Sequence, residues 1–253
     1  MRVAIIQARC GSTRLPGKIF AELSEIPLIW HVVNRLKFCR RIDKIVLATT
    51  TNNADNILAE WAEKEKIEIY RGSETDVLNR YYSTAKMLAL APNDIIIRIT
   101  ADDPFKEPEL IDKVVEMVEN GKTIFAYNNK PPTFPEGLDC EVFTMFALEL
   151  SEIHSTDPYE REHVTQYMYR HPEIFNGQNI SNDIDLSHLR FTIDTEDDYK
   201  MANEVYSHLY KENRIFLLND ILNLLKTNPH ILQINAKVKR SDMYKKIRYE
   251  QNV

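Results

Sequence analysis

The chain of 253 residues has few cysteines, few glycines and no long hydrophobic run. Its three cysteines lie far apart without metal-ligand spacing, which excludes a disulfide scaffold and a zinc finger. No apolar segment approaches the roughly 20 residues that span a bilayer. The apolar stretch at residues 3–6 is too short for a signal peptide. We therefore expect a cytoplasmic protein that acts outside the membrane.

The chain also lacks an excess of positive charge, because 38 acidic residues outnumber 32 lysines and arginines and give a net charge of −6. A protein whose main task is to hold nucleic acid usually needs a basic surface. Nucleic acid is therefore not an expected partner. The content of 43% hydrophobic and 28% charged residues is that of a globular protein with a sizeable core.

The first half alternates short β-branched runs with segments of helical periodicity. Strands are predicted at residues 2–8, 44–48, 67–70, 94–99 and, more weakly, 123–126. Helices are predicted at residues 28–38, 54–64, 77–90 and 107–118. This alternation requires crossover connections and a sheet covered on both faces. We therefore predict a Rossmann-like α/β fold of three α/β/α layers around a mostly parallel, mixed sheet.

The composition changes after residue 127, where residues 128–139 contain three prolines and predict a loop or a strained ribbon. Further strands are predicted at residues 141–143 and 189–193. Further helices are predicted at residues 146–153, 159–169, 197–210 and 218–225. The polar tail after residue 228 is weakly patterned and is expected to form an arm that packs on a neighbour.

The loop after the first predicted strand reads QARCGSTRLPGK over residues 7–18 and combines glycines, hydroxyls and basic side chains. Backbone N–H groups near Gly11 can face an anion, and Arg14 and Lys18 can donate to phosphate. A P-loop is excluded, because five residues separate the two glycines and Lys18 precedes isoleucine rather than serine or threonine. The alternative interpretation is a solvated basic turn.

Two aspartates follow predicted strands at the carboxyl edge of the sheet, where such folds bind ligands. Asp102 follows the strand at residues 94–99, and Asp194 follows the strand at residues 189–193. Mg²⁺ takes oxygen ligands and keeps water and phosphate oxygens in its shell, so the pair can share one cation. The alternatives are a turn at Asp103 and a helix N-cap at Asp194 or Thr195.

Seven segments together resemble the cytidylyltransferases that activate sugar acids. They lie in the family's order at residues 5–18, 48–55, 71–82, 98–104, 134–143, 160–167 and 185–199. The resemblance is strongest to the SpsF-like branch of spore coat polysaccharide biosynthesis, which is related to CMP-KDO and CMP-sialic acid synthetases. It implies a nucleotidyltransferase fold and a Mg²⁺-dependent transfer of CMP from CTP to a sugar acid or related anionic acceptor. Pyrophosphate would be released, in surface polysaccharide or glycan synthesis.

The resemblance also implies roles for particular residues. Catalytic roles fall to Arg14, Lys18, Asp102 and Asp194, of which Asp102 and Asp194 would hold Mg²⁺. Nucleotide contacts fall to Ala8, Arg9, Gly11, Ser12, Thr13, Arg71, Ser73 and Asp76. Acceptor contacts fall to Asp139, Glu141, Arg161, Glu162 and His163. For Asp76 a helix N-terminus is the alternative, and for residues 160–163 a solvated helical turn with a local Glu–Arg pair.

We predict a single nucleotidyltransferase domain over residues 1–228, with a Pro-rich insertion at about 128–185 that serves the acceptor and the dimer contact. Residues 229–253 would form the arm of a homodimer. Lys18 and Asp102 are expected on surface loops, so that Lys18→Ala and Asp102→Asn should abolish most turnover without unfolding.

Two rival functions use a similar architecture. A glycosyltransferase would grip a nucleotide sugar through a metal-binding D-x-D motif, but the adjacent pair Asp102 and Asp103 lacks that spacing. A non-catalytic nucleotide-sensing domain would not need Lys18, Asp102 and Asp194 together.

Overall fold

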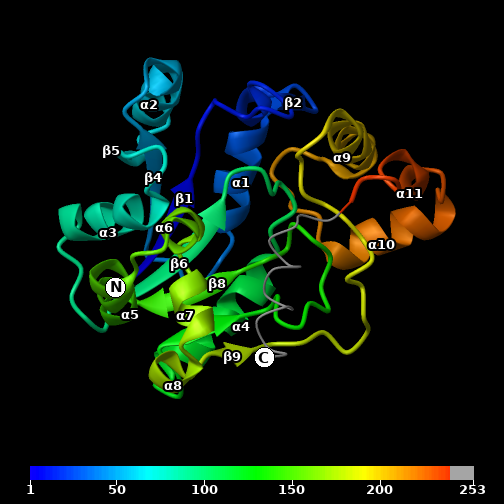
Figure 1. Cartoon of the computed structure of the whole chain (residues 1–253). Coiled ribbons are helices and arrows are strands. Elements are labelled where there is room, and N and C mark those ends of the chain that lie inside the picture. Colours follow the sequence, from blue (N-terminus) through cyan, green and yellow to red (C-terminus); the bar gives the residue numbers. More distant parts are fainter. Residues whose placement is uncertain (240–253) are drawn as a thin grey trace.

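The computed structural model describes residues 1–239. Its centre is a seven-stranded mixed sheet with the strand order β5-β4-β1-β6-β8-β7-β9 (Figure 1). Four strands run parallel to one another, namely β1 (Arg2–Gln7), β4 (Lys44–Thr50), β5 (Glu68–Gly72) and β6 (Ile95–Thr100). The strand β8 (Glu141–Thr144) runs antiparallel to β6 and to β7 (Phe125–Tyr127), and β9 (Gln178–Asn179) pairs with β7. The predicted mixed, mostly parallel sheet is confirmed.

Helices cover both faces of the sheet, as the strands' apolar character requires (Figure 1). In β1, Ala4 and Ile6 belong to one buried cluster, whereas Val3 and Ile5 belong to the other. The first cluster includes side chains of α1 (Leu28–Leu36), α2 (Asn56–Lys64), α4 (Pro108–Glu119), α9 (Glu196–Leu209) and α10 (Leu218–Thr227). The second includes side chains of α3 (Val77–Met87), α5 (Met145–His154), α7 (Gln166–Arg170) and α8 (Pro172–Phe175). The three-layer prediction is thereby confirmed.

The helix predicted at residues 159–169 is wrong, because two short helices replace it. These are α6 (Pro158–His163) and α7, and Val164 between them has a φ of 57°. A β-branched residue in the left-handed region cannot continue a right-handed helix. The break lets Thr165 turn its hydroxyl to Glu141, with an Oγ1–Oε1 distance of 3.0 Å.

The strand predicted at residues 189–193 is also wrong. Only Arg190 forms a bridge, to Glu136, and the segment around it is extended but unpaired as a strand. Its backbone N–H groups instead donate to two loops: Phe191 to the carbonyl of Glu136, and Ile193 to the carbonyl of Asp102. The partner segment at residues 128–139 cannot supply a ladder, because prolines lack the N–H that pairing needs.

Short elements complete the described chain: η1 (Lys18–Phe20), the hairpin of β2 (Glu22–Leu23) and β3 (Ile26–Pro27), η2 (Asn53–Asp55) and α11 (Ile231–Ile234). Figure 1 shows α9, α10 and α11 gathered on one side of the molecule. Ile231 of α11 is fully buried in the first cluster. The rest of the predicted arm, residues 240–253, lies outside the described residues. None of the helices within residues 1–239 combines the length and apolar character needed to cross a bilayer.

Candidate active site

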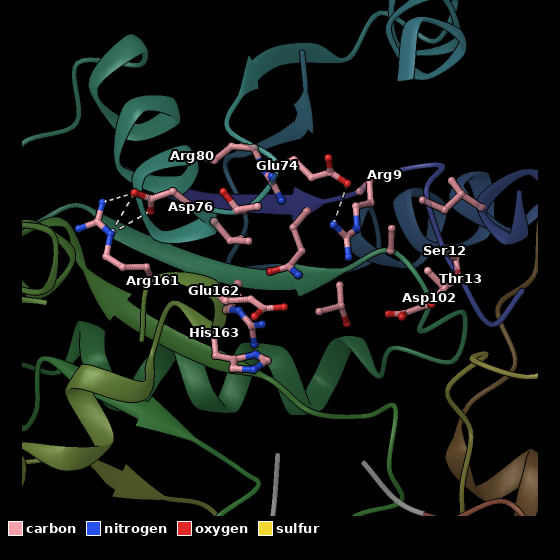
Figure 2. A pocket seen from close by; sticks show the side chains of 18 of the residues that line it. Arg9, Ser12, Thr13, Glu74, Asp76, Arg80, Asp102, Arg161, Glu162 and His163 are labelled. Atoms are coloured by element: carbon pink, nitrogen blue, oxygen red, sulfur yellow. Dashed lines mark hydrogen bonds and ion pairs between the residues drawn. The ribbon is translucent and has the colours of Figure 1, made fainter. Parts of the chain in front are cut away.

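A pocket of about 700 Å³ lies beyond the carboxyl ends of β1 and β6 (Figure 2). Its walls include the loop after β1, the turn before α3 and the first turns of that helix, β6 with the loop after it, α6, and Asp194 just before α9. The predicted site residues among its walls are Ala8, Arg9, Ser12, Thr13, Arg14, Lys18, Asp76, Asp102, Arg161, Glu162, His163 and Asp194. The fold therefore gathers most of the predicted site in one place.

A smaller pocket of about 120 Å³ adjoins the first. It contains the predicted acceptor residues Asp139 and Glu141. The residues Arg98, Thr100, Asp102 and Asp194 line both pockets. The two cavities therefore meet at the predicted metal-binding carboxylates.

Three predicted nucleotide contacts do not line either pocket. Arg71 donates to the backbone carbonyls of Thr50 and Asn52, each at 2.9 Å. The hydroxyl of Ser73 accepts a hydrogen bond from the backbone N–H of Asp76 at 3.0 Å. Gly11 lies outside the lining as well. In this structure the Arg71 side chain joins β5 to the end of β4 and the loop after it, and Ser73 shapes the turn between β5 and α3.

Lys18 joins the two carboxylates that were predicted to share a cation. Its Nζ lies 2.8 Å from Asp102 Oδ2 and 2.9 Å from Asp194 Oδ1, and it also donates to the carbonyl of Ile193 at 2.7 Å. Burial disfavours its charge, but the two aspartates outweigh burial and raise the pKa of Lys18. The expectation that Lys18 lies on a surface loop is wrong, since it is 8% exposed.

Asp194 is held in its ionised form by the cations around it. Burial alone would raise the pKa of its carboxyl, but Lys18, Arg14 and Arg190 lower it. Arg14 forms an ion pair with Asp194 at 2.9 Å while more than half of the Arg14 side chain stays exposed. Thr195, rather than Asp194, is the N-cap of α9, so the cap alternative falls on the neighbouring residue.

The donor set fits a magnesium ion that substrate would help to hold. Within residues 1–239, no cluster of three or more His, Cys, Asp or Glu side chains could form a metal cage. Mg²⁺ is commonly bound by one or two carboxylates together with water and substrate phosphates. Asp102 and Asp194, brought together around one ammonium group, meet that requirement.

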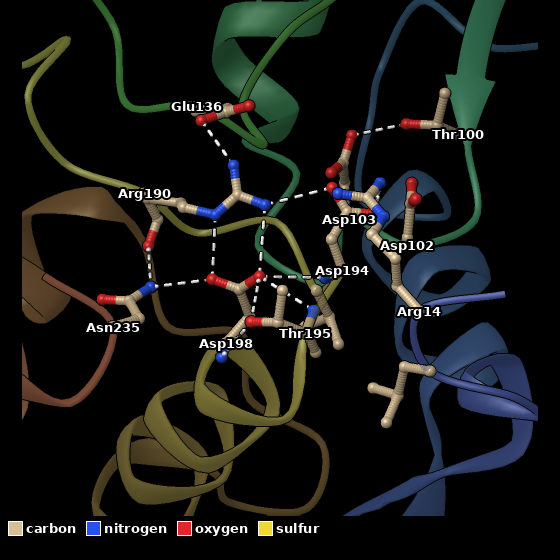
Figure 3. A network of polar contacts seen from close by, with 12 residues as sticks. Arg14, Thr100, Asp102, Asp103, Glu136, Arg190, Asp194, Thr195, Asp198 and Asn235 are labelled. Carbon is tan, nitrogen blue, oxygen red and sulfur yellow. Dashed lines mark hydrogen bonds and ion pairs between the residues drawn. The ribbon is translucent and has the colours of Figure 1, made fainter. Parts of the chain in front are cut away.

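A buried network that the sequence interpretation missed supports Asp194 (Figure 3). The guanidinium of Arg190 contacts Asp194 at 3.0 Å, Asp198 at 2.8 Å and Glu136 at 2.7 Å. Asp198 is fully buried and accepts from the backbone N–H of Asp194 at 3.1 Å. The spacing of Thr195 and Asp198 was a usable signal, because it matches a capping box at the start of α9.

Asp103 has hydrogen-bond partners different from those of Asp102. It is buried and receives hydrogen bonds from Lys106, at 2.8 Å, and from the hydroxyl of Thr100. Burial raises the pKa of Asp103 against the opposing effect of Lys106. Asp102 therefore lines both pockets, whereas Asp103 lines the smaller one and is held there by Lys106 and Thr100.

The acceptor side contains two ion pairs with different positions. Arg98 of β6 contacts Glu141 of β8 at 2.5 Å, and the cation holds its charge because Glu141 outweighs burial and raises the pKa of Arg98. Arg161 forms ion pairs with Asp76 at 2.7 Å and Glu152 at 2.9 Å (Figure 2). Asp76 is also the N-cap of α3. Arg161 therefore joins α6 to α3, instead of forming the local Glu–Arg pair considered as its alternative.

The mixed α/β sheet, and the cationic loop and two carboxylates in its pocket, agree with the nucleotidyltransferase class that the comparisons show. A sequence model described as cytidylyltransferase matches residues 3–236. The chain belongs to the cytidylyltransferase family.

Individual relatives agree with this assignment. The chain is 31% identical over 232 residues to the spore coat polysaccharide biosynthesis protein SpsF of Bacillus subtilis, covering 89% of this chain and 94% of that protein. It is 36% identical over 117 residues to a 3-deoxy-manno-octulosonate cytidylyltransferase of Anaeromyxobacter sp., covering 46% and 47% of the two chains. A solved cytidylyltransferase from Leptospira borgpetersenii superposes with a TM-score of 0.85 at 35% identity, covering 92% of this chain and 96% of that one.

Proposed function

We propose that the protein transfers CMP from CTP to a sugar acid or related anionic acceptor and releases pyrophosphate, with Mg²⁺ as its cofactor. The observation that carries the proposal is the position of Lys18 between Asp102 and Asp194, in one pocket with the loop after β1. A triphosphate needs cations and backbone donors, and its metal needs carboxylates. The names of the relatives support cytidine chemistry and a setting in surface polysaccharide or glycan synthesis.

The two adjoining cavities suggest how the substrates meet. We place the nucleotide in the larger cavity and the acceptor in the smaller one, which contains Asp139 and Glu141. An acceptor oxygen would then attack the α-phosphorus in line, while the bond from that phosphorus to the bridging oxygen of pyrophosphate breaks. Positioning and charge neutralisation supply most of the acceleration in such transfers.

Several charged side chains of the two cavities have roles in this scheme. Asp102 and Asp194 would hold Mg²⁺, which when bound neutralises phosphate charge. Arg14 and Lys18 would stabilise the charge that develops on pyrophosphate. Among the described residues that line the smaller cavity, Arg98 is the basic one and is paired with Glu141; we assign the anionic group of the acceptor to the guanidinium of Arg98. Glu162 and His163 line the larger cavity on the acceptor side, and Arg161 would hold α6 in place there.

Thermal unfolding with CTP, UTP, ATP and GTP, each with and without Mg²⁺, tests the nucleotide. A ligand at about 100 times its Kd adds roughly 2.7 kcal/mol, which raises the Tm by about 5–10 °C at this chain length. We expect the largest shift with CTP and a further increase with Mg²⁺. Pyrophosphate release with a panel of sugar acids then tests the acceptor. No shift with any triphosphate would contradict the proposal.

The cellular and assembly context is also a proposal. We place the enzyme in the cytoplasm, where CTP is made available, and as a homodimer with a second copy of this chain. Sedimentation equilibrium of the full chain distinguishes a mass near 29.6 kDa from twice that value.

A further inference from the structure

Arg80 is a buried cation in the wall of the larger pocket that the reaction scheme does not use. It lies on α3, is 2% exposed and is one of the residues lining the pocket. Its Nη1 donates to the carbonyl of Ser73 at 2.5 Å, whereas its Nε is buried and makes no hydrogen bond. Within residues 1–239, Arg80 forms no ion pair with a carboxylate.

The nearest carboxylates are engaged with other partners. Glu74 forms an ion pair with Arg9 at 3.1 Å and accepts from Asn52 at 2.7 Å. Asp55 accepts from the backbone N–H of Cys10 at 2.6 Å and from the hydroxyl of Thr50. Burial lowers the pKa of Arg80 and the positive charge of Arg9 lowers it further, while Tyr81, Asp55 and Glu74 oppose this only in part. A buried cation with one carbonyl partner and no carboxylate in contact is costly, and acceptor atoms of a ligand would satisfy its remaining N–H groups.

The place of Arg80 along the pocket identifies which part of the ligand it meets. Figure 2 shows Arg80 on the wall between Asp76 and Glu74, whereas Asp102 lies near Ser12 and Thr13. In the proposed function the phosphates lie against Asp102 and the loop that carries Ser12 and Thr13. The nucleoside then extends along the wall that contains Arg80.

We propose that Arg80 reads the pyrimidine base, by donating to O2 and N3 of cytosine, and that it selects cytosine over uracil. Cytosine presents two adjacent acceptors, O2 and N3, to a guanidinium fork. Uracil carries a hydrogen on N3, which opposes an arginine because arginine has donors only. This inference rests on the proposed function, since it requires a nucleotide in the larger pocket.

The test compares binding of CMP and UMP by calorimetry without metal, in the wild-type protein and in Arg80→Lys and Arg80→Gln. A bidentate arginine contact to a base accounts for discrimination of about 10- to 100-fold. We therefore expect the wild-type preference for CMP to fall by at least about 10-fold in both variants. Lysine keeps the positive charge but cannot donate two parallel hydrogen bonds as a guanidinium does. The lysine variant therefore still tests the inference if the glutamine variant fails to fold.

Control variants separate the outcomes. Arg9→Gln removes a more exposed cation from the same pocket and should weaken CMP and UMP equally. If both Arg80 variants keep the wild-type ratio of CMP to UMP affinity, the inference is overturned. Equal weakening of both nucleotides, with no loss of binding to free cytidine, would place a phosphate at Arg80 and would also overturn it. If the wild-type protein binds no cytidine nucleotide, the proposed function itself fails.

Discussion

At the scale of single residues, the ammonium group of Lys18 lies between the carboxylates of Asp102 and Asp194, which would otherwise repel each other. We predict that Lys18→Met lowers turnover at least 100-fold, in the manner of a lost electrostatic group at the reacting phosphate. We also predict a loss of about 2 kcal/mol in unfolding free energy, because Asp102 and Asp194 are then left partly buried without their partner. Urea unfolding with and without Mg²⁺ measures this, and added Mg²⁺ should narrow the gap to the wild type. An unchanged unfolding free energy would show that the ion pairs of Lys18 with Asp102 and Asp194 do not stabilise the fold.

Arg190 is a positioning residue, since it contacts Asp194 but does not line the pocket. Partners that orient a metal ligand typically contribute 10- to 100-fold to metal affinity or activity. We predict that Arg190→Lys lowers kcat by about 10-fold or more and raises the Mg²⁺ concentration needed for half-maximal rate, with little change in KM for CTP. Arg41 forms ion pairs with two glutamates of α4, away from the pocket. The control variant Arg41→Lys should therefore leave kcat, the Mg²⁺ requirement and the KM for CTP unchanged. An unaltered Mg²⁺ requirement in Arg190→Lys would reduce Arg190 to a structural role.

At the scale of elements, His31 of α1 forms a hydrogen bond with the backbone of β2. The ring is buried, its Nε2 donates to the carbonyl of Leu23 at 2.8 Å, and it packs on Tyr206 with ring centroids 4.4 Å apart. Burial lowers the pKa of His31 from 6.5 to about 4, against the opposing effect of the Leu23 bond. The unfolded chain therefore binds the proton first as the pH falls below 6.5.

Stability from this histidine is complete above pH 6.5 and is lost as the pH falls toward 4. We predict that unfolding free energy falls by about 2 kcal/mol between pH 7 and pH 5 on account of His31. Urea unfolding of the wild type and of His31→Gln at pH 7 and pH 5 measures how much the unfolding free energy of each protein changes with pH. An equal change of unfolding free energy with pH in the two proteins would contradict a neutral buried imidazole at His31.

The elements that the sequence predicted well are those whose hydrophobic period decides the outcome. The runs that became β1, β4 and β6 are apolar throughout because both faces of the sheet are covered. The two wrong elements depend on distant partners. Residues 159–169 have helical periodicity, yet the helix breaks at Val164. On one side of the break Arg161 pairs with Asp76, and on the other Thr165 donates its hydroxyl to Glu141. Periodicity contains no information on such contacts.

At the scale of the whole molecule, the prediction of the site followed from topology. The carboxyl ends of parallel strands share one edge, so Lys18 after β1 and Asp102 after β6 had to approach each other. The sequence could not predict that Lys18 would be buried between the aspartates, or that Arg190 would join Glu136 to Asp194. Those facts depend on how residues 128–139 and 189–195 pack together, and neither segment has a regular period.

The segment after α11 contacts the network of Arg190 and Asp198 that supports Asp194. Asn235 donates to the carbonyl of Arg190 and to Asp198, each at 3.1 Å, whereas Ile231 only packs in the core. Asn235→Ala should cost about 1–3 kcal/mol through lost buried hydrogen bonds, and Ile231→Val about 0.5–1.5 kcal/mol through a lost methyl group.

These two variants distinguish stability from positioning. Turnover measured well below both unfolding midpoints should fall in Asn235→Ala, because the Asp198 and Arg190 groups that orient Asp194 are released. It should stay near the wild-type value in Ile231→Val, since no polar contact to the network is lost. Equal turnover in the two variants would mean that the C-terminal segment stabilises the fold without any part in shaping the site. A selective loss would mean that residues 229–239 are as much a part of the active-site support as the Pro-rich segment that supplies Glu136.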